Sequence, residues 1–369
     1  MSFVNVNNQL IIARAMDPNA ISCMDAAIGV DNSNFKTEII NAIAGANASL
    51  PENPGFELHP YKGLLAYTNQ SKIIIGTFPP ISYLIDTITQ QNPGVLLQTL
   101  SQPTHPTQVI TKPQIPFFHG NISALWAVLL TPLEITQLNV QLGINRTAAK
   151  TYLIQFLNRQ GIYYDDIILS TQRKLGKLNP NENLGYTYED VNLKNICIDE
   201  TLILKLIISN TENKIICFTN GATFRTNGLK LFTRKAMAGL VNTAKSDAFS
   251  LFLRGCQGLG LHIEMQCLPH YAWTSLSNLT QAQRSTKLIF QLRLSKGRKC
   301  VHADLNNFTG TEFTVIAPFS PAAHGTIEHH PIVVGYRAVN GPVPAVNILK
   351  HIYNKFRNNQ HDLLYPYNI

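Results

Sequence analysis

Short runs of aliphatic and β-branched residues alternate with longer amphipathic stretches along much of the chain. The runs at 72–76, 162–169, 214–219 and 312–317 are typical of strands that are buried on both faces. The stretches at 148–160, 200–209 and 346–357 have apolar residues at helical spacing and predict helices. Strands that alternate with helices predict an α/β fold, with a central, mostly parallel, four-stranded sheet flanked by helices.

The ends of these strands carry residues that stop strand pairing. Thr77-Phe78-Pro79-Pro80 follows the first strand, and proline has no amide hydrogen to give to a neighbouring strand. The third strand runs into Asn220-Gly221 and the fourth into Pro318. Because ligands of such sheets bind beyond the carboxyl ends of the strands, we expect the functional residues in these loops.

Two parts of the chain stand outside this alternation. Residues 1–58, rich in Asn, Ala and Pro, are predicted to be an N-terminal extension of an α/β domain at 59–369. Residues 222–300 separate the third and fourth strands and hold one predicted helix, at 233–244, and two strand-like stretches, at 262–268 and 288–294. We interpret this segment as an insertion in the domain.

The net charge of +8 is unevenly distributed. Residues 222–300 carry 12 Lys and Arg but only two acidic residues, whereas residues 1–110 are net acidic. A basic concentration of this kind suits a polyanion, because each neutralised phosphate releases condensed counterions. The insertion is therefore a candidate nucleic-acid surface, although a basic solvated surface would have the same composition.

The remaining composition narrows the class of protein. We find neither an apolar run long enough to cross a membrane nor a secretory signal, so we expect a cytoplasmic protein, most simply a monomer. The six cysteines include no closely spaced pair and are expected to be free thiols. Cys256, His262, Cys267 and His270 lie close in sequence, but their spacing fits no standard zinc pattern.

Several segments, in order along the chain, carry a resemblance. They are His59-Pro60 with 73–80, Phe117-Phe118-His119-Gly120-Asn121 with Trp126, 161–168 with Arg173, Glu189-Asp190-Val191-Asn192-Leu193, 215–221 and 317–322. Together they resemble the motifs of the uracil-DNA glycosylase superfamily, and most closely its deoxyinosine and mismatch-type branch. Residues 1–58 and the basic insertion have no counterpart in this resemblance.

The resemblance implies a monofunctional DNA glycosylase that works without metal or organic cofactor. Such an enzyme flips a base out of single- or double-stranded DNA and hydrolyses its bond to the sugar, leaving an abasic site. The target would be a deaminated base, in repair, or a modified cytosine such as phage DNA carries, in defence. The alternative is a DNA-binding protein that kept the fold and lost the chemistry.

The first loop is expected to hold the attacking water. Gly76 would let the backbone approach the ligand, and Thr77 would position the water. The best-known uracil enzymes have an acidic residue two positions after this glycine, where this chain has Phe78. Phe78 and Phe118 are instead candidate platforms for the flipped base, unless they pack the core.

Asp166 falls where the best-known uracil enzymes carry an Asn that reads the pyrimidine edge. An ionised carboxylate only accepts hydrogen bonds, which suits an exocyclic amine and repels the O4 of uracil. Asp166 is thus expected either to read the base or to act as the catalytic acid or base. A structural role at a strand end is the third interpretation, and Asp165 is the candidate if the alignment is off by one residue.

The remaining candidates come from the last motif and the basic insertion. Ser320 is expected at the base and, with Pro321, at the DNA backbone, while His324 is expected to stabilise the leaving base, unless it faces solvent. Ala317 stands where a histidine serves this purpose in the best-known uracil enzymes. Phosphate contacts are assigned to Arg293, Lys296, Arg298 and Lys299.

Overall fold

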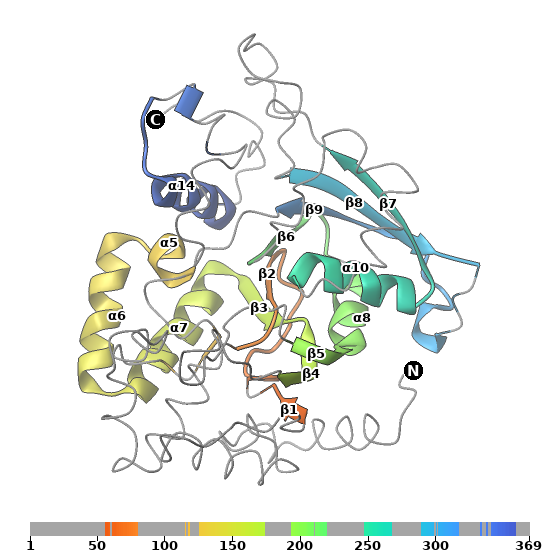
Figure 1. Ribbon diagram of the computed structural model, residues 1–369, viewed down its shortest axis with the longest axis horizontal. Coiled ribbons are helices and arrows are strands. Elements are labelled where there is room, and N and C mark those ends of the chain that lie inside the picture. Colours follow the sequence, from red (N-terminus) through yellow and green to blue (C-terminus); the bar gives the residue numbers. More distant parts are fainter. Residues whose placement is uncertain are drawn as a thin grey trace, which may run out of the picture.

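The computed structural model describes residues 56–59, 61–79, 115, 117–118, 125–173, 193–209, 211–219, 247–267, 289–298, 300, 302–316, 333, 337–338 and 341–358. These residues form two β-sheets with helices packed on the larger one (Figure 1). The segment at 233–244, predicted as a helix, lies outside this range, as do residues 1–55.

The larger sheet has six strands in the order β3-β2-β6-β9-β8-β7. The first four are parallel: β3 (Ile162–Asp166), β2 (Lys72–Gly76), β6 (Lys214–Phe218) and β9 (Thr311–Ile316). The last two, β8 (Ile289–Lys296) and β7 (Leu261–Cys267), are antiparallel. The α/β class and the mostly parallel sheet are confirmed, but the sheet has six strands where four were predicted.

The two additional strands come from the basic segment, which therefore extends the main sheet. In β7 the polar residues His262 and Glu264 are exposed while Leu261 is buried, and in β8 Leu292 and Leu294 are buried around the exposed Arg293. This alternation is typical of antiparallel strands with one face toward solvent. The pattern indicated strands here, but not the sheet that they join.

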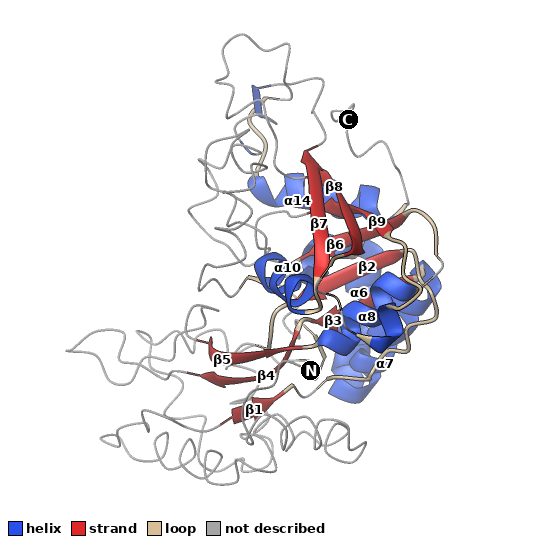
Figure 2. Ribbon diagram, turned by 90° about the vertical axis from the view of Figure 1, so that its right-hand side faces the viewer, coloured by secondary structure: helices blue, strands red, loops and turns tan. Residues whose placement is uncertain are grey.

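The predicted strand at 162–169 is two strands in two sheets. β3 ends at Asp166, which pairs with Gly76 at the end of β2, the only neighbour of β3 among the described strands. The chain then enters β4 (Ile168–Arg173), which pairs antiparallel with β1 (Phe56–Leu58) and β5 (Leu193–Ile198) in the smaller sheet. Figure 2 shows this sheet beneath the larger one.

The helices begin and end where capping residues stand. In α6 (Pro132–Ile144) Thr131 and Glu134 form a reciprocal capping box, and α7 (Arg146–Gln160) ends at Gly161, whose φ of 61° is left-handed. Asp199 caps α8 (Glu200–Ile208), and Asp247 caps α10 (Ala248–Gly258). The other helices are α5 (Ala127–Leu129), the 3₁₀ turn η7 (Ala303–Leu305) and α14 (Ala345–Arg357).

Helices cover both faces of the parallel strands. Phe218 of β6 packs on Phe249 and Phe252 of α10, whereas the preceding residue, Cys217, meets Tyr353 of α14. Successive residues of a strand point to opposite faces, so α10 and α14 lie on opposite faces of the sheet (Figures 1 and 2). Among the described residues, no helix is both long enough and apolar enough to cross a membrane.

Candidate active site

Gly76 and Asp166 are paired across the parallel ladder at the carboxyl ends of β2 and β3. The backbone beyond both strands stays tied together, because Ile167 N–H donates to Gly76 O at 2.9 Å and Ile168 N–H to Thr77 O at 3.2 Å. Thr219, just after β6, donates from its N–H to Ile75 O at 2.9 Å. The first loop and Asp166 therefore lie at the same edge of the sheet.

His59 binds the Asp166 side chain, with 2.8 Å between Nε2 and Oδ2. Both side chains are buried, at 0% and 5% exposure. The Nδ1 atom of His59 accepts the Tyr61 N–H at 3.1 Å, so the proton of the ring is on Nε2 and is donated to Asp166. The pair joins residues 107 positions apart in the sequence.

The other oxygen of Asp166, Oδ1, is buried and has no hydrogen-bond partner in the part of the chain that the structure describes. It lies against the Cα of Gly76, where the β-carbon of any other residue would overlap it. The hydroxyl of Tyr164, two residues before Asp166 on the same face of β3, lies 3.2 Å from the position of that β-carbon. A carboxylate oxygen with free lone pairs therefore faces Gly76 and Tyr164.

Aromatic rings surround the His59–Asp166 pair, and the two proposed base platforms are among them. Phe118 is stacked on Tyr164, with 4.6 Å between ring centroids, and its ring centroid lies 5.6 Å from that of His59. Phe78 meets His59 edge-on at 5.2 Å. Phe118 and Phe78 are only 1% and 6% exposed. In this structure both rings pack around the pair rather than forming an open surface.

Lys62 connects the end of β3 with Asp199, which follows β5 of the smaller sheet and caps α8. Its ammonium group lies 2.9 Å from Asp165 Oδ1 and 2.9 Å from Asp199 Oδ2, and it also donates to the backbone oxygen of Asp166. Burial alone would lower the pKa of Lys62, but the two carboxylates outweigh it and hold that pKa above its usual value. Burial likewise opposes ionisation of Asp199, yet Lys62 keeps the pKa of Asp199 below its usual value.

Both carboxylate oxygens of Asp165 accept hydrogen bonds within this ion network. Its Oδ1 accepts from Lys62 and from the Asp166 N–H at 2.8 Å, and its Oδ2 accepts from the Tyr163 hydroxyl at 2.8 Å. Burial, together with the Asp165 charge, raises the pKa of Tyr163, so the phenol remains a donor. Asp165 therefore holds the end of β3 in place, and Asp166 is the carboxylate that can meet a ligand.

This arrangement gives the site one reactive group, a buried carboxylate with one oxygen fixed by a donor and the other bare. Such an oxygen can accept a proton from water, accept a hydrogen bond from a base, or stabilise a positive charge that develops nearby. Lys62 already shares its charge between Asp165 and Asp199. The negative charge of Asp166 has no cation of its own within hydrogen-bond distance among the described residues.

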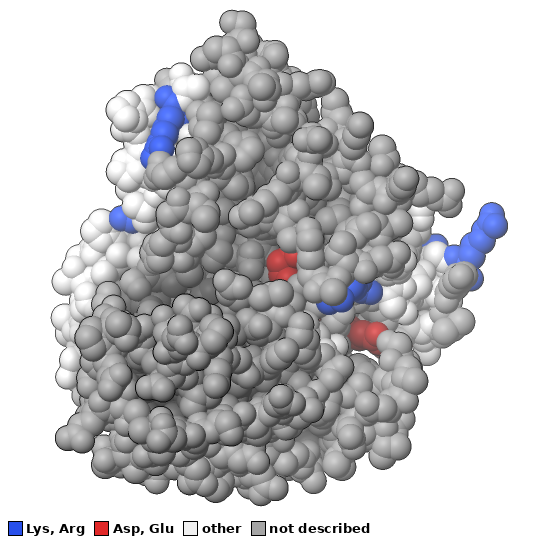
Figure 3. All heavy atoms as spheres, in the orientation of Figure 1, with Lys and Arg blue, Asp and Glu red and all other residues white. Residues whose placement is uncertain are grey.

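Of the remaining predicted site residues, those that the structure describes lie away from this cluster. Ser320, Pro321, His324 and Lys299 lie outside the described residues. Arg293 and Lys296 are on β8, which β6 and β9 separate from β2, and Arg298 follows in the exposed turn. Basic side chains are visible at the right-hand edge of Figure 3, where Figure 1 places β7 and β8. Arg293 is already paired with Glu312 at 2.9 Å.

The possible zinc ligands do not come together in the described part of the chain. Cys256 is buried in α10, whereas His262 is exposed on β7 and contacts Glu264 at 3.3 Å. The side chain of Cys267, and all of His270, lie outside the described residues. Within those residues no three His, Cys, Asp or Glu side chains are grouped as metal ligands would be.

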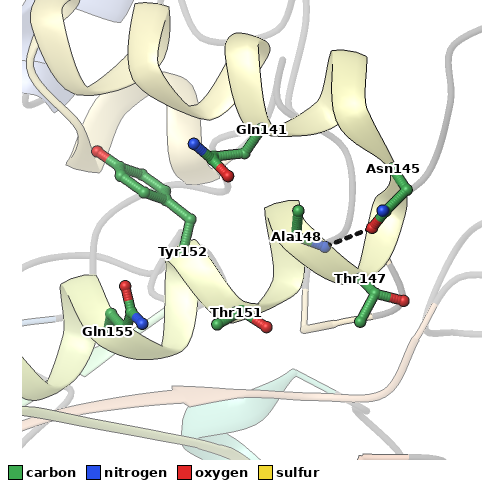
Figure 4. A pocket seen from close by; sticks show the side chains of 7 residues that line it. All are labelled: Gln141, Asn145, Thr147, Ala148, Thr151, Tyr152 and Gln155. Carbon is green, nitrogen blue, oxygen red and sulfur yellow. Dashed lines mark hydrogen bonds between the residues drawn. The ribbon is translucent and has the colours of Figure 1, made fainter.

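A pocket of about 510 Å³ is lined by residues of α6, α7 and the turn between them (Figure 4). Its lining is polar but uncharged and consists of Gln141, Asn145, Thr147, Ala148, Thr151, Tyr152 and Gln155. Asn145 is occupied as the cap of α7 and Tyr152 donates to Gln137, so this pocket offers no acid or base for catalysis.

Sequence reasoning missed three residues that shape the site: His59 as the partner of Asp166, and Lys62 and Asp199 as the ion network behind it. His59 stands out in the sequence only as part of a motif, and nothing local connects it with residue 166. Asp199 before an apolar helix is a capping signal, which points to the helix and not to the site.

No family model, characterised protein or solved structure matches the chain.

Proposed function

We propose that this chain is a DNA glycosylase in which Asp166 is the catalytic carboxylate. One observation carries the proposal: the buried Asp166 has Oδ2 held by His59, while Oδ1, beside Gly76 at the carboxyl edge of the parallel strands, has no hydrogen-bond partner among the described residues. This is the edge at which α/β sheets bind ligands. The parallel strands β3-β2-β6-β9 would be the core of a uracil-DNA-glycosylase-like domain spanning 59–369, and the DNA would be single- or double-stranded.

The chemistry requires little beyond a placed carboxylate. The bond between the sugar C1′ and the base nitrogen breaks, and its electron pair leaves with the base. The positive charge that develops on the sugar is stabilised by the Asp166 carboxylate. A water oxygen then bonds to C1′, its proton passes to Asp166 Oδ1, and that proton is released to solvent while the base is protonated.

The position of Asp166 accounts for the missing acid of the first motif. That motif has Phe78 where the best-known uracil enzymes carry a carboxylate on the loop after the first strand. Asp166 belongs to the neighbouring strand and is paired with Gly76, so a carboxylate reaches the same glycine from β3. Base-reading by the same oxygen is the alternative use, and it would favour bases that present an N–H.

A DNA-binding protein without catalytic activity is the second candidate. The observation that favours it is the packing of Phe118, which is stacked on Tyr164, contacts His59 and is only 1% exposed. A flipped base could use this platform only if a ring moved. The basic segment serves either candidate, because phosphate contacts need no chemistry.

The test uses oligonucleotides that carry uracil, hypoxanthine or modified cytosine, each single- and double-stranded. The full-length protein should produce alkali-labile breaks at one class of base, and Asp166→Asn should lower their rate to a small but measurable residual rate. Asp304→Asn, an exposed acid in η7, is the matched control and should remain active. Binding to every oligonucleotide without a break would favour the non-catalytic protein, and neither binding nor breaks would refute both candidates.

A further inference from the structure

We infer that His59 is the positioning residue of this site: it presents Asp166 as a hydrogen-bond acceptor with Oδ1 turned toward Gly76. The inference rests on the proposed function, in which Oδ1 receives the proton of the attacking water. It assigns a role to a residue that lies between β1 and β2 and contributes no reacting atom.

Both the backbone and the ring of His59 are in contact with neighbouring residues. Its backbone N–H donates to Leu169 O at 2.9 Å, which fixes the residue against β4. Its ring lies between Phe118 and Phe78, at centroid distances of 5.6 and 5.2 Å, and Tyr61 packs edge-on at 5.9 Å. A buried imidazole with this many contacts has little rotational freedom, so its nitrogen atoms keep their directions.

The hydrogen bonds of the ring decide what it can do. Because Nδ1 accepts the Tyr61 N–H, only Nε2 carries a proton, and Nε2 faces Asp166 Oδ2. His59 therefore acts as a donor to the carboxylate. It cannot take a proton on Nδ1 without losing the bond to Tyr61.

This donor fixes the orientation of the carboxylate. With Oδ2 bound to His59 and the Asp166 backbone oxygen bound to Lys62, the side chain has one arrangement, in which Oδ1 lies against Gly76. Oδ1 is then an acceptor only, so the group that meets it must supply the hydrogen. Water and a base N–H qualify, whereas a carbonyl edge such as the O4 of uracil does not.

Three variants separate positioning from a merely structural role. His59→Gln places an amide N–H near the position of Nε2 and should keep activity within about tenfold of the wild type. His59→Leu removes the donor and should lower kcat by roughly 10- to 100-fold, the usual cost of losing an orienting hydrogen bond, with KM little changed. In an Asp166→Asn background, His59→Leu should cost nothing more, because the two residues act as one unit.

The contrary results are equally clear. If Gln restores nothing, or if His59→Leu lowers the residual activity of the Asp166→Asn variant as much as it lowers that of the wild type, His59 does not act through the carboxylate. His262→Leu, an exposed histidine on β7, is the control for loss of an imidazole. Should His59→Leu fail to fold, the comparison of Gln with wild type still decides.

A second measurement does not depend on activity. The nitrogen NMR shifts of the His59 ring in the full-length protein should show a proton on Nε2 and none on Nδ1. A proton on Nδ1 would overturn the inference. If Nε2 carries the proton but no oligonucleotide is cut, the proposed function falls while the hydrogen bond to Asp166 is upheld, so the two failures are distinguishable.

Discussion

Asp166 Oδ1 rests directly on the Cα of Gly76, and this contact joins the carboxyl ends of β2 and β3. Gly76 lies in a regular strand, so its backbone conformation is one that any residue could adopt. A glycine is required here because there is no room for a side chain. A β-carbon at this position would overlap Oδ1 and approach the Tyr164 hydroxyl at 3.2 Å. The absence of a side chain on β2 is therefore what allows the carboxylate of β3 to reach this position.

Gly76→Ala should remove activity while leaving a folded protein. The added methyl group forces Asp166 to rotate, which breaks its bond to His59, and the overpacking should cost about 1–3 kcal/mol of stability. Glycosylase assays and urea denaturation measure the two effects. Gly143→Ala is the control, because nothing lies within 4 Å of its added methyl and an exposed helix gains about 0.5–1 kcal/mol from this change. Normal activity in Gly76→Ala would mean that Oδ1 is not the reacting atom.

Lys62→Met should destabilise the fold strongly, by about 3–5 kcal/mol, because it leaves Asp165 and Asp199 buried without their shared cation. The pKa of Asp199 is held below 3.8, so its contribution is present above pH 3.8 and is lost as the pH falls through the folded value. The pKa of Lys62 is raised above 10.5, so its contribution is lost only as the pH rises beyond 10.5.

In Lys62→Met, burial without the cation raises the pKa of Asp199, so the variant regains stability as Asp199 takes up a proton. The gap in unfolding free energy between wild type and variant should therefore be largest near neutral pH and should already shrink as the pH falls toward 3.8. Urea denaturation at several pH values measures it. Lys350→Met, an exposed lysine on α14, is the control and should change stability by less than about 0.5 kcal/mol. A gap that grows in acid would contradict the ion network.

The contribution of Lys214 to stability should depend on pH in the opposite direction to that of Lys62. The Lys214 ammonium group is buried at the end of α8, where it donates to Leu206 O at 2.8 Å and Ser209 O at 2.7 Å, and burial lowers its pKa from 10.5 to about 8. Between pH 8 and 10.5 Lys214 binds more protons in the unfolded chain than in the folded one, so the stability that Lys214 contributes should rise with pH. Lys214→Met should lose this rise, which thermal unfolding across that range detects. Parallel pH curves for the two proteins would show that Lys214 titrates normally.

The sequence predicted the parts of the fold that depend on local pattern. The strand of β2 was recognisable because Ile73, Ile74 and Ile75 are buried on both faces. The helices were recognisable where caps frame an amphipathic run, as for α7. Helix α10 was missed because Gly255 and Gly258 are poor helix formers. In the structure Gly255 lets α10 approach the side chains of Ile203 and Ile198 closely, which compensates for its low propensity.

The parts that depend on distant pairing could not be predicted in the same way. The strand character of β7 and β8 was visible, but their place beside β9 depends on a register with Thr311–Ile316. Gly76 and Asp166 lie together because β2 and β3 are parallel and end at the same edge of the sheet. The bond from His59 to Asp166 crosses 107 residues and depends on the path of the chain through the second sheet, for which a single sequence carries no signal.

The basic segment should bind DNA through its phosphates. Replacing Lys296, Arg298 and Lys299 by Glu should weaken binding to every sequence alike and reduce the salt slope by about 0.9 for each phosphate that is no longer neutralised. Arg293→Glu adds a separate effect, because Arg293 also binds Glu312. Arg159→Glu on α7, beside the opposite edge of the sheet, is the control. Unchanged affinity in the triple variant would exclude this segment from the interface.

Asp166→Asn distinguishes the possible roles of the carboxylate, since the His59 N–H still requires an acceptor and the amide oxygen will face it. The amide NH₂ is then turned toward Gly76, and a donor replaces the bare acceptor. If Asp166 is the catalytic carboxylate, activity on every base is lost and none is gained. If it reads an N–H of the base, the native substrate loses about 1–3 kcal/mol of binding from two opposed donors, and uracil, whose O4 accepts, becomes the better substrate.

A structural role gives a third result, in which the variant melts at a lower temperature and keeps its specificity. One substitution, assayed on cytosine-type, hypoxanthine and uracil substrates beside a thermal melt, therefore separates all three. The catalytic role predicts loss without a change in melting, because Asn fills the same space and keeps the bond to His59. A fully active and equally stable variant would contradict every role, since no buried oxygen that meets water, base or sugar tolerates exchange for a donor.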